Sequence, residues 1–173
     1  MATNIFQRLN ELNNLSLITD RTQADVDYAL ELQREAIHTS ENLRGAYNAS
    51  DKNRVAAAIN GLINILRDTG YSTGGQFAHV KSNWREGDIV KVADNAEVIE
   101  SMRELQRVLP EISLEIPNNL DALTWQTANA IERILFDMID IFNMLADMWL
   151  WCGEGYAGYD FEEHRLDDHW IMD

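Results

Sequence analysis

The feature of this sequence that most constrains its fold is a helix-opening pattern that occurs twice. Residues 48–55 (Asn-Ala-Ser-Asp-Lys-Asn-Arg-Val) begin one stretch with helical apolar spacing, and residues 124–131 (Thr-Trp-Gln-Thr-Ala-Asn-Ala-Ile) begin another. Aligned, Asn53 falls on Asn129, and we interpret both as capping or turn residues. Any two amphipathic helices would share part of this match. The prediction of two related helical units therefore depends mainly on the polar residues before each helix and on the aligned asparagines. The apolar residues that align after them are Val55 with Ile131, Ile59 with Leu135, Leu62 with Met138 and Leu66 with Phe142.

The remaining sequence also favours helices. The chain has only 2 Pro and 9 Gly, and few β-branched runs interrupt its good helix formers. We therefore predict an all-α protein, built as two related helical lobes or as one helical bundle. Helices are expected within 1–20 and over about 23–39, 51–68, 93–109 and 125–150. The expected parts are an N-terminal lobe (1–70), a loop-rich linker (71–92), a C-terminal lobe (93–151) and an acidic, aromatic, extended tail (152–173).

The last predicted helix has apolar residues at 4-3-4-3-4 spacing, which is the heptad pattern of helices that pack at shallow angles. Two interpretations remain open. The stripe is either the core of an intramolecular bundle or a seam between copies of the chain. As candidate interface residues we take its six members, which are Ile131, Leu135, Met138, Phe142, Leu145 and Trp149.

The tail changes in character. Between residues 160 and 173 it carries Asp160, Glu162, Glu163, Asp167, Asp168 and Asp173 against Arg165 alone. Such a segment would either bind a basic groove on a neighbouring protein or pack back onto its own helices. Aromatic side chains often contribute much of the energy of an interface. The further candidate interface residues are therefore Trp84, expected as a loop anchor, and Tyr156, Tyr159, Phe161 and Trp170.

The charge balance argues against two classes of partner. The formal net charge of -15 disfavours nucleic acid, which needs clustered Lys and Arg, and no basic amphipathic face suits an anionic membrane. The apolar run from Ile131 to Trp151 is interrupted by polar residues at about every fourth position, so we do not expect it to span a bilayer. The chain does not open like a signal peptide, and we expect synthesis and folding in a cytoplasm.

Recognisable catalytic patterns are not found in the sequence. The single cysteine, Cys152, follows apolar residues that would raise its pKa and leave it unreactive. His164 and Asp168 could contribute to a divalent metal site, but the neighbouring acids lack the spacing of a calcium loop, and we interpret the region as a solvated acidic tail. Residues 70–75 lack the Lys-Ser/Thr that completes a phosphate loop. We therefore predict no catalytic, cofactor-binding or metal-binding residues and no enzymatic activity.

Several segments, taken in order, resemble small virion-associated proteins of phages and prophages from Gram-positive hosts. The resemblance covers roughly residues 18–158. It depends on the shared order of segments 18–26, 45–55, 70–71, Trp84 with Asp88-Ile89, 123–135 and a closing 151–158. Beyond Gly158 this chain carries about fifteen acidic and aromatic residues where the family tends to stop.

The resemblance implies a non-enzymatic structural protein encoded among tail and baseplate genes. We therefore expect an adaptor or connector in the virion, without a cofactor. Its expected partners are other virion proteins and further copies of itself. Two alternatives come from the residues. The five Trp and five Tyr could make a receptor- or carbohydrate-binding module. The acidic tail could instead belong to a small phage-encoded regulator that mimics nucleic acid.

Overall fold

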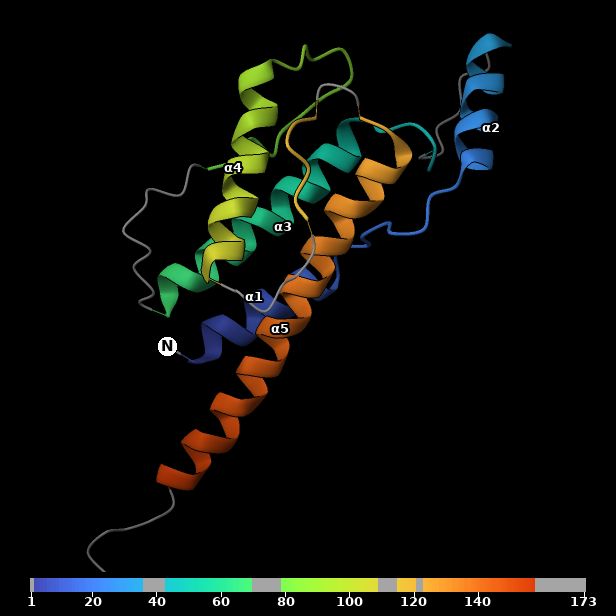
Figure 1. The fold of residues 1–173 in the computed structure, drawn as a ribbon. Helices are drawn as coiled ribbons and strands as arrows, with labels where there is room; N and C mark the ends of the chain where they lie inside the picture. The colour runs from blue at the N-terminus through green and yellow to red at the C-terminus, as the bar shows by residue number, and fades with distance from the viewer. Residues whose placement is uncertain (1, 36–42, 70–78, 109–114, 121–122, 158–173) are drawn as a thin grey trace, which may run out of the picture.

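The protein is all-α, as the sequence predicts. The computed structural model describes residues 2–35, 43–69, 79–108, 115–120 and 123–157, with side chains from residue 5 to residue 148 of these ranges. Within them lie five helices and no strand (Figure 1). The helices are α1 (Ala2–Asn13), α2 (Gln23–Arg34), α3 (Ala49–Asp68), α4 (Val92–Val108) and α5 (Trp125–Ala157).

The helix boundaries differ from the predicted ones mainly at α5. The predicted end near Leu150 is wrong, because the helix continues through Gly153 and Gly155 to Ala157. A glycine inside a helix costs only about 1 kcal/mol relative to alanine, so two of them do not stop it. For the helix expected over 23–39, the described part ends at Arg34, and 36–42 lie outside the described residues.

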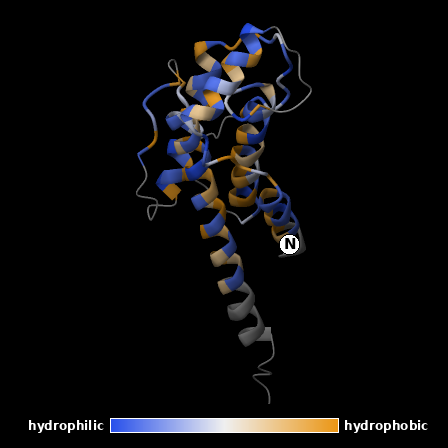
Figure 2. Cartoon of the chain, turned by 90° about the vertical axis from the view of Figure 1, so that its right-hand side faces the viewer, coloured by the Kyte–Doolittle hydropathy of each residue, from blue (hydrophilic) through white to orange (hydrophobic). Residues whose placement is uncertain are grey.

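Both halves of the chain contribute to one hydrophobic core. The helix α3 packs against α1, α4 and α5, and α1 also packs against α5. Apolar and polar residues alternate along these helices (Figure 2), as expected for helices that bury one face. The most deeply buried large side chains are Ile59, Leu62 and Ile65 of α3, Met102 and Leu105 of α4, and Ile131, Ile134, Leu135 and Met138 of α5.

The two helices that carry the repeated pattern, α3 and α5, lie side by side and run in the same direction (Figure 1). Near their starts, Arg54 of α3 contacts Glu132 of α5. Further along, α1 bridges them, with Leu12 against Gly61 of α3 and Asn13 hydrogen bonded to Asn143 of α5. The starts of α3 and α5 therefore lie together, and α1 contacts both helices further along.

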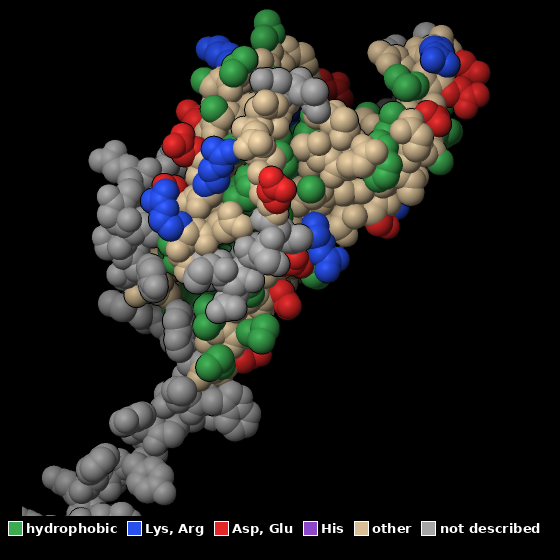
Figure 3. Space-filling view, viewed as in Figure 1, with side chains coloured by type: hydrophobic (Ala, Val, Ile, Leu, Met, Phe, Trp, Pro, Cys, Tyr) green, Lys and Arg blue, Asp and Glu red, His purple; other side chains and the backbone are tan. Residues whose placement is uncertain are grey.

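The helix α2 stands apart from this bundle. It leads away from the other helices in the ribbon and stands off the body in the space-filling view (Figure 1, Figure 3). None of its residues is buried. The first turn of α2 nevertheless contacts the rest of the chain, because Trp125 Nε1 donates to Gln23 Oε1 at 3.1 Å. Gly45 also lies so close to this turn that an added Cβ atom would be 2.0 Å from the Asp25 carbonyl oxygen.

Candidate functional site

Four charged side chains form a buried ion cluster where α3, α5 and the segment before α2 meet. Arg21 Nη2 lies 2.9 Å from Asp51 Oδ1 and 2.7 Å from Glu132 Oε1. Arg54 contacts Glu132 through Nε and Nη2, each at 2.9 Å, and also pairs with Asp51. The side chains of Arg21, Asp51 and Glu132 are at most 2% exposed. Two positive and two negative charges balance inside the fold.

The ion cluster is also hydrogen bonded to the backbone around it. Glu132 also accepts the backbone N–H of Ile18 at 2.6 Å, and Arg21 donates to the carbonyl oxygens of Ile18 and Arg44. Burial opposes the charge of Arg54, but its hydrogen bonds to Glu132 and Asp51 outweigh that effect and raise its pKa. Because each charge is paired and hydrogen bonded, the cluster fastens residues 18–21 to α3 and α5.

The aligned asparagines of the repeat do not cap helices, so their assignment as capping or turn residues is wrong. Asn53 accepts the backbone N–H of Trp84 at 2.7 Å and donates to the Trp84 carbonyl at 3.0 Å. Asn129 does the same with Arg21, at 3.1 and 2.9 Å. A carboxamide offers one acceptor and two donors, so it can pair with both polar groups of a single residue's backbone.

Each of these pairs of asparagine hydrogen bonds, which we call a clamp, joins one half of the chain to the other. The long helix of the first half, α3, holds a segment of the second half, and α5 holds a segment of the first. Asn60 extends the α3 clamp by pairing with the N–H and C=O of Val80 at 3.0 and 2.8 Å. The actual N-caps are Asn48, in a capping box with Asp51, and Thr124, whose hydroxyl accepts the Thr127 N–H at 3.2 Å.

The heptad stripe of α5 lies in the chain's own core over most of its length. Ile131, Leu135 and Met138 are fully buried, and Phe142 is 3% exposed. Leu145 is half-buried, and the side chain of Trp149 lies outside the described residues. The first interpretation, an intramolecular core, therefore accounts for these four buried residues, which are not available to a partner in this fold.

Trp84 lies at the centre of a concave region that we call the Trp84 surface, formed by Tyr47, Lys52, Lys81, Trp84 and Val90. Hollows of about 170 Å³ and about 290 Å³ meet here, and both are lined by Tyr47, Lys52, Trp84 and Val90. Trp84 is 8% exposed, and its Nε1 donates to the Lys81 carbonyl at 3.0 Å. Trp84 is thus a loop anchor whose ring forms a wall of the hollows.

Cations and aromatic rings alternate on the Trp84 surface. Lys81 Nζ lies 3.8 Å from the Trp84 ring centroid, and Lys52 Nζ lies 5.3 Å from the same ring and 5.7 Å from that of Tyr47. Burial lowers the pKa of Lys52, and the charge of Asp94 partly opposes this. Burial also raises the pKa of Tyr47, with Glu132 and Asp51 adding to the effect. The surface combines apolar walls with a partly desolvated ammonium group.

The tail candidates cannot be placed. Tyr156 belongs to α5, but the structure does not describe its side chain. Tyr159, Phe161 and Trp170 lie outside the described residues. The suggested metal residues His164 and Asp168 also fall outside. Among the described residues, no group of three or more His, Cys, Asp or Glu side chains could hold a metal ion. No helix in the described ranges is long and apolar enough to cross a membrane.

Sequence reasoning did not identify the ion cluster or Lys52. The partners of the cluster are distant in sequence, and Arg21 and Glu132 are 111 positions apart. One signal was available, because Arg21, Asp51 and Arg54 fall within segments 18–26 and 45–55, and Glu132 within segment 123–135, whose order is the basis of the expected family resemblance. Charged residues at the start of an apolar helix face are otherwise most simply interpreted as solvent-exposed.

Comparison with known proteins identifies no relative for this chain. No protein-family model, no curated protein and no solved structure matches it.

Proposed function

We propose that this protein is a non-enzymatic structural component of a phage virion, an adaptor or connector in the tail or baseplate region that acts by binding copies of itself and neighbouring proteins. The observation that carries the proposal is α2, a well-capped amphipathic helix that buries none of its residues in its own chain. The resemblance of residues 18–158 to virion-associated proteins supplies the class.

The helix α2 is built to persist despite its isolation. Thr22 and Asp25 form a capping box, in which Asp25 accepts the Thr22 N–H at 2.7 Å and Thr22 accepts the Asp25 N–H at 3.3 Å. Isolated helices shorter than about 12–15 residues are marginal in water, and α2 has 12. Its Tyr28 and Leu30 are 55% and 42% exposed. A partner that covers these side chains would stabilise the helix.

The α5 helix presents a second uncovered face. Phe136, Met144 and Met148 are 50%, 60% and 60% exposed, and the end of α5 projects beyond α1 and α3 (Figure 1). Exposed apolar side chains gathered on one element are typical of protein contact sites. Two projecting helices at opposite ends of the bundle suit a component that connects neighbours.

The experiment is quantitative mass spectrometry of purified particles from a host that produces this protein. We expect the chain in the particles at a fixed ratio to other virion proteins, and retained after washing with high salt. Its absence from particles, together with abundance in the host lysate, would overturn the proposal and favour the phage-encoded regulator. Binding of the purified chain to a glycan array would favour the receptor-binding alternative.

A further inference from the structure

We infer that the Trp84 surface binds the acidic, aromatic segment 159–170 of a second copy of the chain, so that copies join head to tail. The inference rests on the assembly role proposed above and names one contact within it. Two facts carry it. The site holds a lysine that forms no hydrogen bond or ion pair with a described residue, and the ring–acid pairs at 159–162 cannot reach that lysine within one chain.

The cation is Lys52. Its Nζ faces the rings of Tyr47 and Trp84, and it forms no hydrogen bond or ion pair with any residue that the structure describes. The charge of Asp94 raises the pKa of Lys52 against the effect of burial, but the two side chains form no ion pair. A partly desolvated ammonium beside two aromatic walls gains most from a ligand that brings both a carboxylate and an apolar ring.

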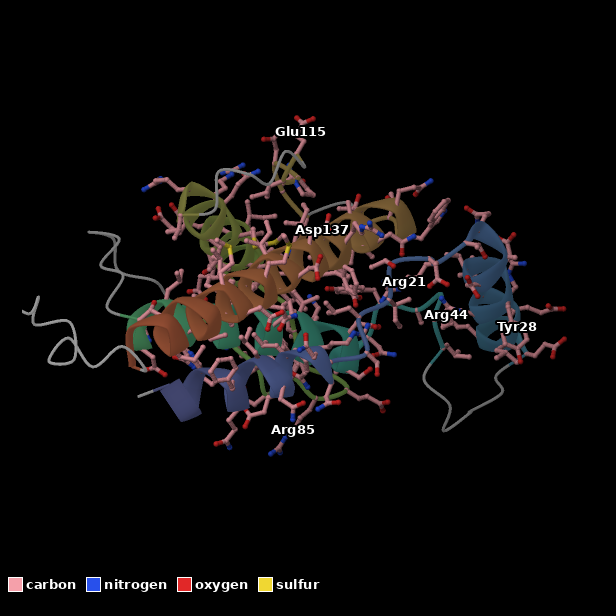
Figure 4. The ribbon with its side chains drawn as sticks, turned by 90° about the horizontal axis from the view of Figure 1, so that it is seen from below. Arg21, Tyr28, Arg44, Arg85, Glu115 and Asp137 are labelled. Carbon is pink, nitrogen blue, oxygen red and sulfur yellow. The ribbon has the colours of Figure 1, made fainter. Side chains whose placement is uncertain are left out.

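The rim of the site differs in charge from the rest of the chain. The formal net charge of the whole chain is -15. Around the two hollows, basic and acidic side chains are equal in number, and Arg85 points away from the helices into solvent (Figure 4). The basic members of the rim are Lys52, Lys81 and Arg85, and the acidic members are Glu86, Asp88 and Asp94, of which Asp88 pairs with Lys81 at 3.1 Å.

The complementary segment follows α5. Residues 159–170 contain Tyr159, Phe161 and Trp170 interleaved with five acids, against a single arginine. An aromatic ring followed or preceded by a carboxylate occurs at Tyr159-Asp160 and at Phe161-Glu162. Either pair would place a ring in a hollow and an oxygen at Lys52 Nζ.

Geometry directs the contact to a second copy. The hollows include Leu123, next to the start of α5, whereas the segment begins beyond its end. The 33 residues of α5 separate these ends by about 48 Å at 1.5 Å per residue. Phe161 lies four residues past Ala157 and can reach at most about 14 Å further, and the acids up to Asp168 at most about 40 Å. The ring–acid pairs at 159–162 therefore bind in another copy, and such a heterologous contact generates rings or filaments.

Isotope-resolved cross-linking of the full chain tests the contact. Equal amounts of unlabelled and ¹⁵N-labelled protein are mixed and treated with a carbodiimide, which joins amines to carboxylates in contact. We expect peptides that join Lys52 to Asp160, Glu162 or Glu163 and that pair one isotope with the other. The Lys81–Asp88 link is the internal control. If that link forms while Lys52 joins only acids of its own isotope, or none of these acids, the inference is overturned.

Substitutions at Lys52 separate charge from fold. We expect Lys52→Glu to weaken binding of a synthetic peptide of residues 158–173 to the full chain by at least about tenfold, whereas Lys52→Arg keeps it within about threefold. Arg34→Glu reverses a charge on α2, far from the site, and should leave peptide binding unchanged. Equal loss with Lys52→Glu and Arg34→Glu would show a general charge effect and would contradict the site.

A mixing experiment tests the head-to-tail arrangement. Lys52→Glu removes the site, and a triple variant (Asp160→Asn, Glu162→Gln, Glu163→Gln) removes the charge of the segment. By light scattering, each variant alone should stay monomeric, the mixture should stop at dimers, and the unmodified chain should form larger species. Larger species in both variants would overturn the inference. The outcome is independent of particle composition, because a chain found in virions without these links would keep the proposed function and lose only this contact.

Discussion

Asn53 and Asn129 show at the residue scale why the repeated pattern exists. Each asparagine side chain forms hydrogen bonds with both the N–H and the C=O group of one residue. That residue lies in a segment without helix or sheet, so its backbone has no partner in regular secondary structure. Buried backbone groups are costly when unpaired, so a segment that crosses a helix face needs such a partner.

Replacement of Asn53 by alanine tests this role. We expect Asn53→Ala to lower the free energy of unfolding by about 1–3 kcal/mol, because the N–H and C=O of Trp84 lose their partners. Asn64→Ala is the matched control, since Asn64 lies on the same helix, is half-buried and makes no hydrogen bond among the described residues. Urea unfolding followed by circular dichroism measures both. Equal effects of the two variants would contradict the clamp.

Tyr47 predicts a loss of stability at alkaline pH. Its pKa is raised in the folded state by burial, so the folded chain holds the phenol proton at a pH where the unfolded chain releases it. The contribution of Tyr47 is therefore complete below the unfolded pKa of about 10 and declines above it. We expect the free energy of unfolding of the unmodified chain to fall more steeply above about pH 10 than that of Tyr47→Phe. Parallel curves for the two proteins would show that Tyr47 is not responsible.

At the scale of elements, α2 and α4 have similar sequences but differ in how they pack. Ala24-Asp25, Glu31 and Arg34 of α2 and the following Glu35 align with Ala93-Asp94, Glu100 and Arg103-Glu104 of α4. Both helices use an aspartate at the third position to accept the N-cap N–H. However, α4 packs on α3, whereas no residue of α2 is buried.

The difference between α2 and α4 follows from the segment before each helix. Arg21 is clamped only two residues ahead of α2, so the chain continues outward (Figure 4). Trp84 is clamped eight residues ahead of α4, and the intervening loop turns the chain back, with Gly87 at φ 86° and Asp88 N–H bonded to the Arg85 carbonyl at 3.1 Å. Glycine suits that left-handed conformation because it has no Cβ.

Caps on α2 and α3 should have different consequences. Thr22→Ala removes the cap of a helix without tertiary burial, so we expect faster amide exchange confined to residues 23–34 and almost unchanged global stability. Asn48→Ala removes the cap of a core helix and should lower the free energy of unfolding by about 1 kcal/mol. Hydrogen exchange by mass spectrometry and urea unfolding together measure these effects. A global loss from Thr22→Ala would show that α2 stabilises the fold.

For the whole molecule, the buried charges balance while the surface is strongly acidic. Arg21 and Arg54 neutralise Asp51 and Glu132 inside, so the net charge of -15 belongs to the exterior and to the segments outside the described residues. Such a surface opposes non-specific association between copies. A contact between copies would therefore need a local positive charge, and Lys52 supplies one on the Trp84 surface.

Two aspartate substitutions on α5 distinguish its core face from its open face. Phe142→Asp places a carboxylate at a position that is 3% exposed, and we expect a loss of at least about 4 kcal/mol and an unfolded or aggregated chain. Phe136→Asp changes a side chain that is 50% exposed and should leave the helix content unchanged. Circular dichroism and urea unfolding check both. A soluble, cooperatively folded Phe142→Asp protein would show that the heptad stripe is not the core.

The sequence by itself determined the helical class, most helix positions and the buried stripe of α5, because apolar spacing and caps act over a few residues. Even so, it placed the end of α5 too early, since two glycines do not outweigh continued helical hydrogen bonding. Only the tertiary structure decided what Asn53 and Asn129 do, that Arg21 meets Glu132, and that α2 stays uncovered while α4 packs. These outcomes depend on groups brought together from distant parts of the chain, and helix periodicity carries no information about such pairings.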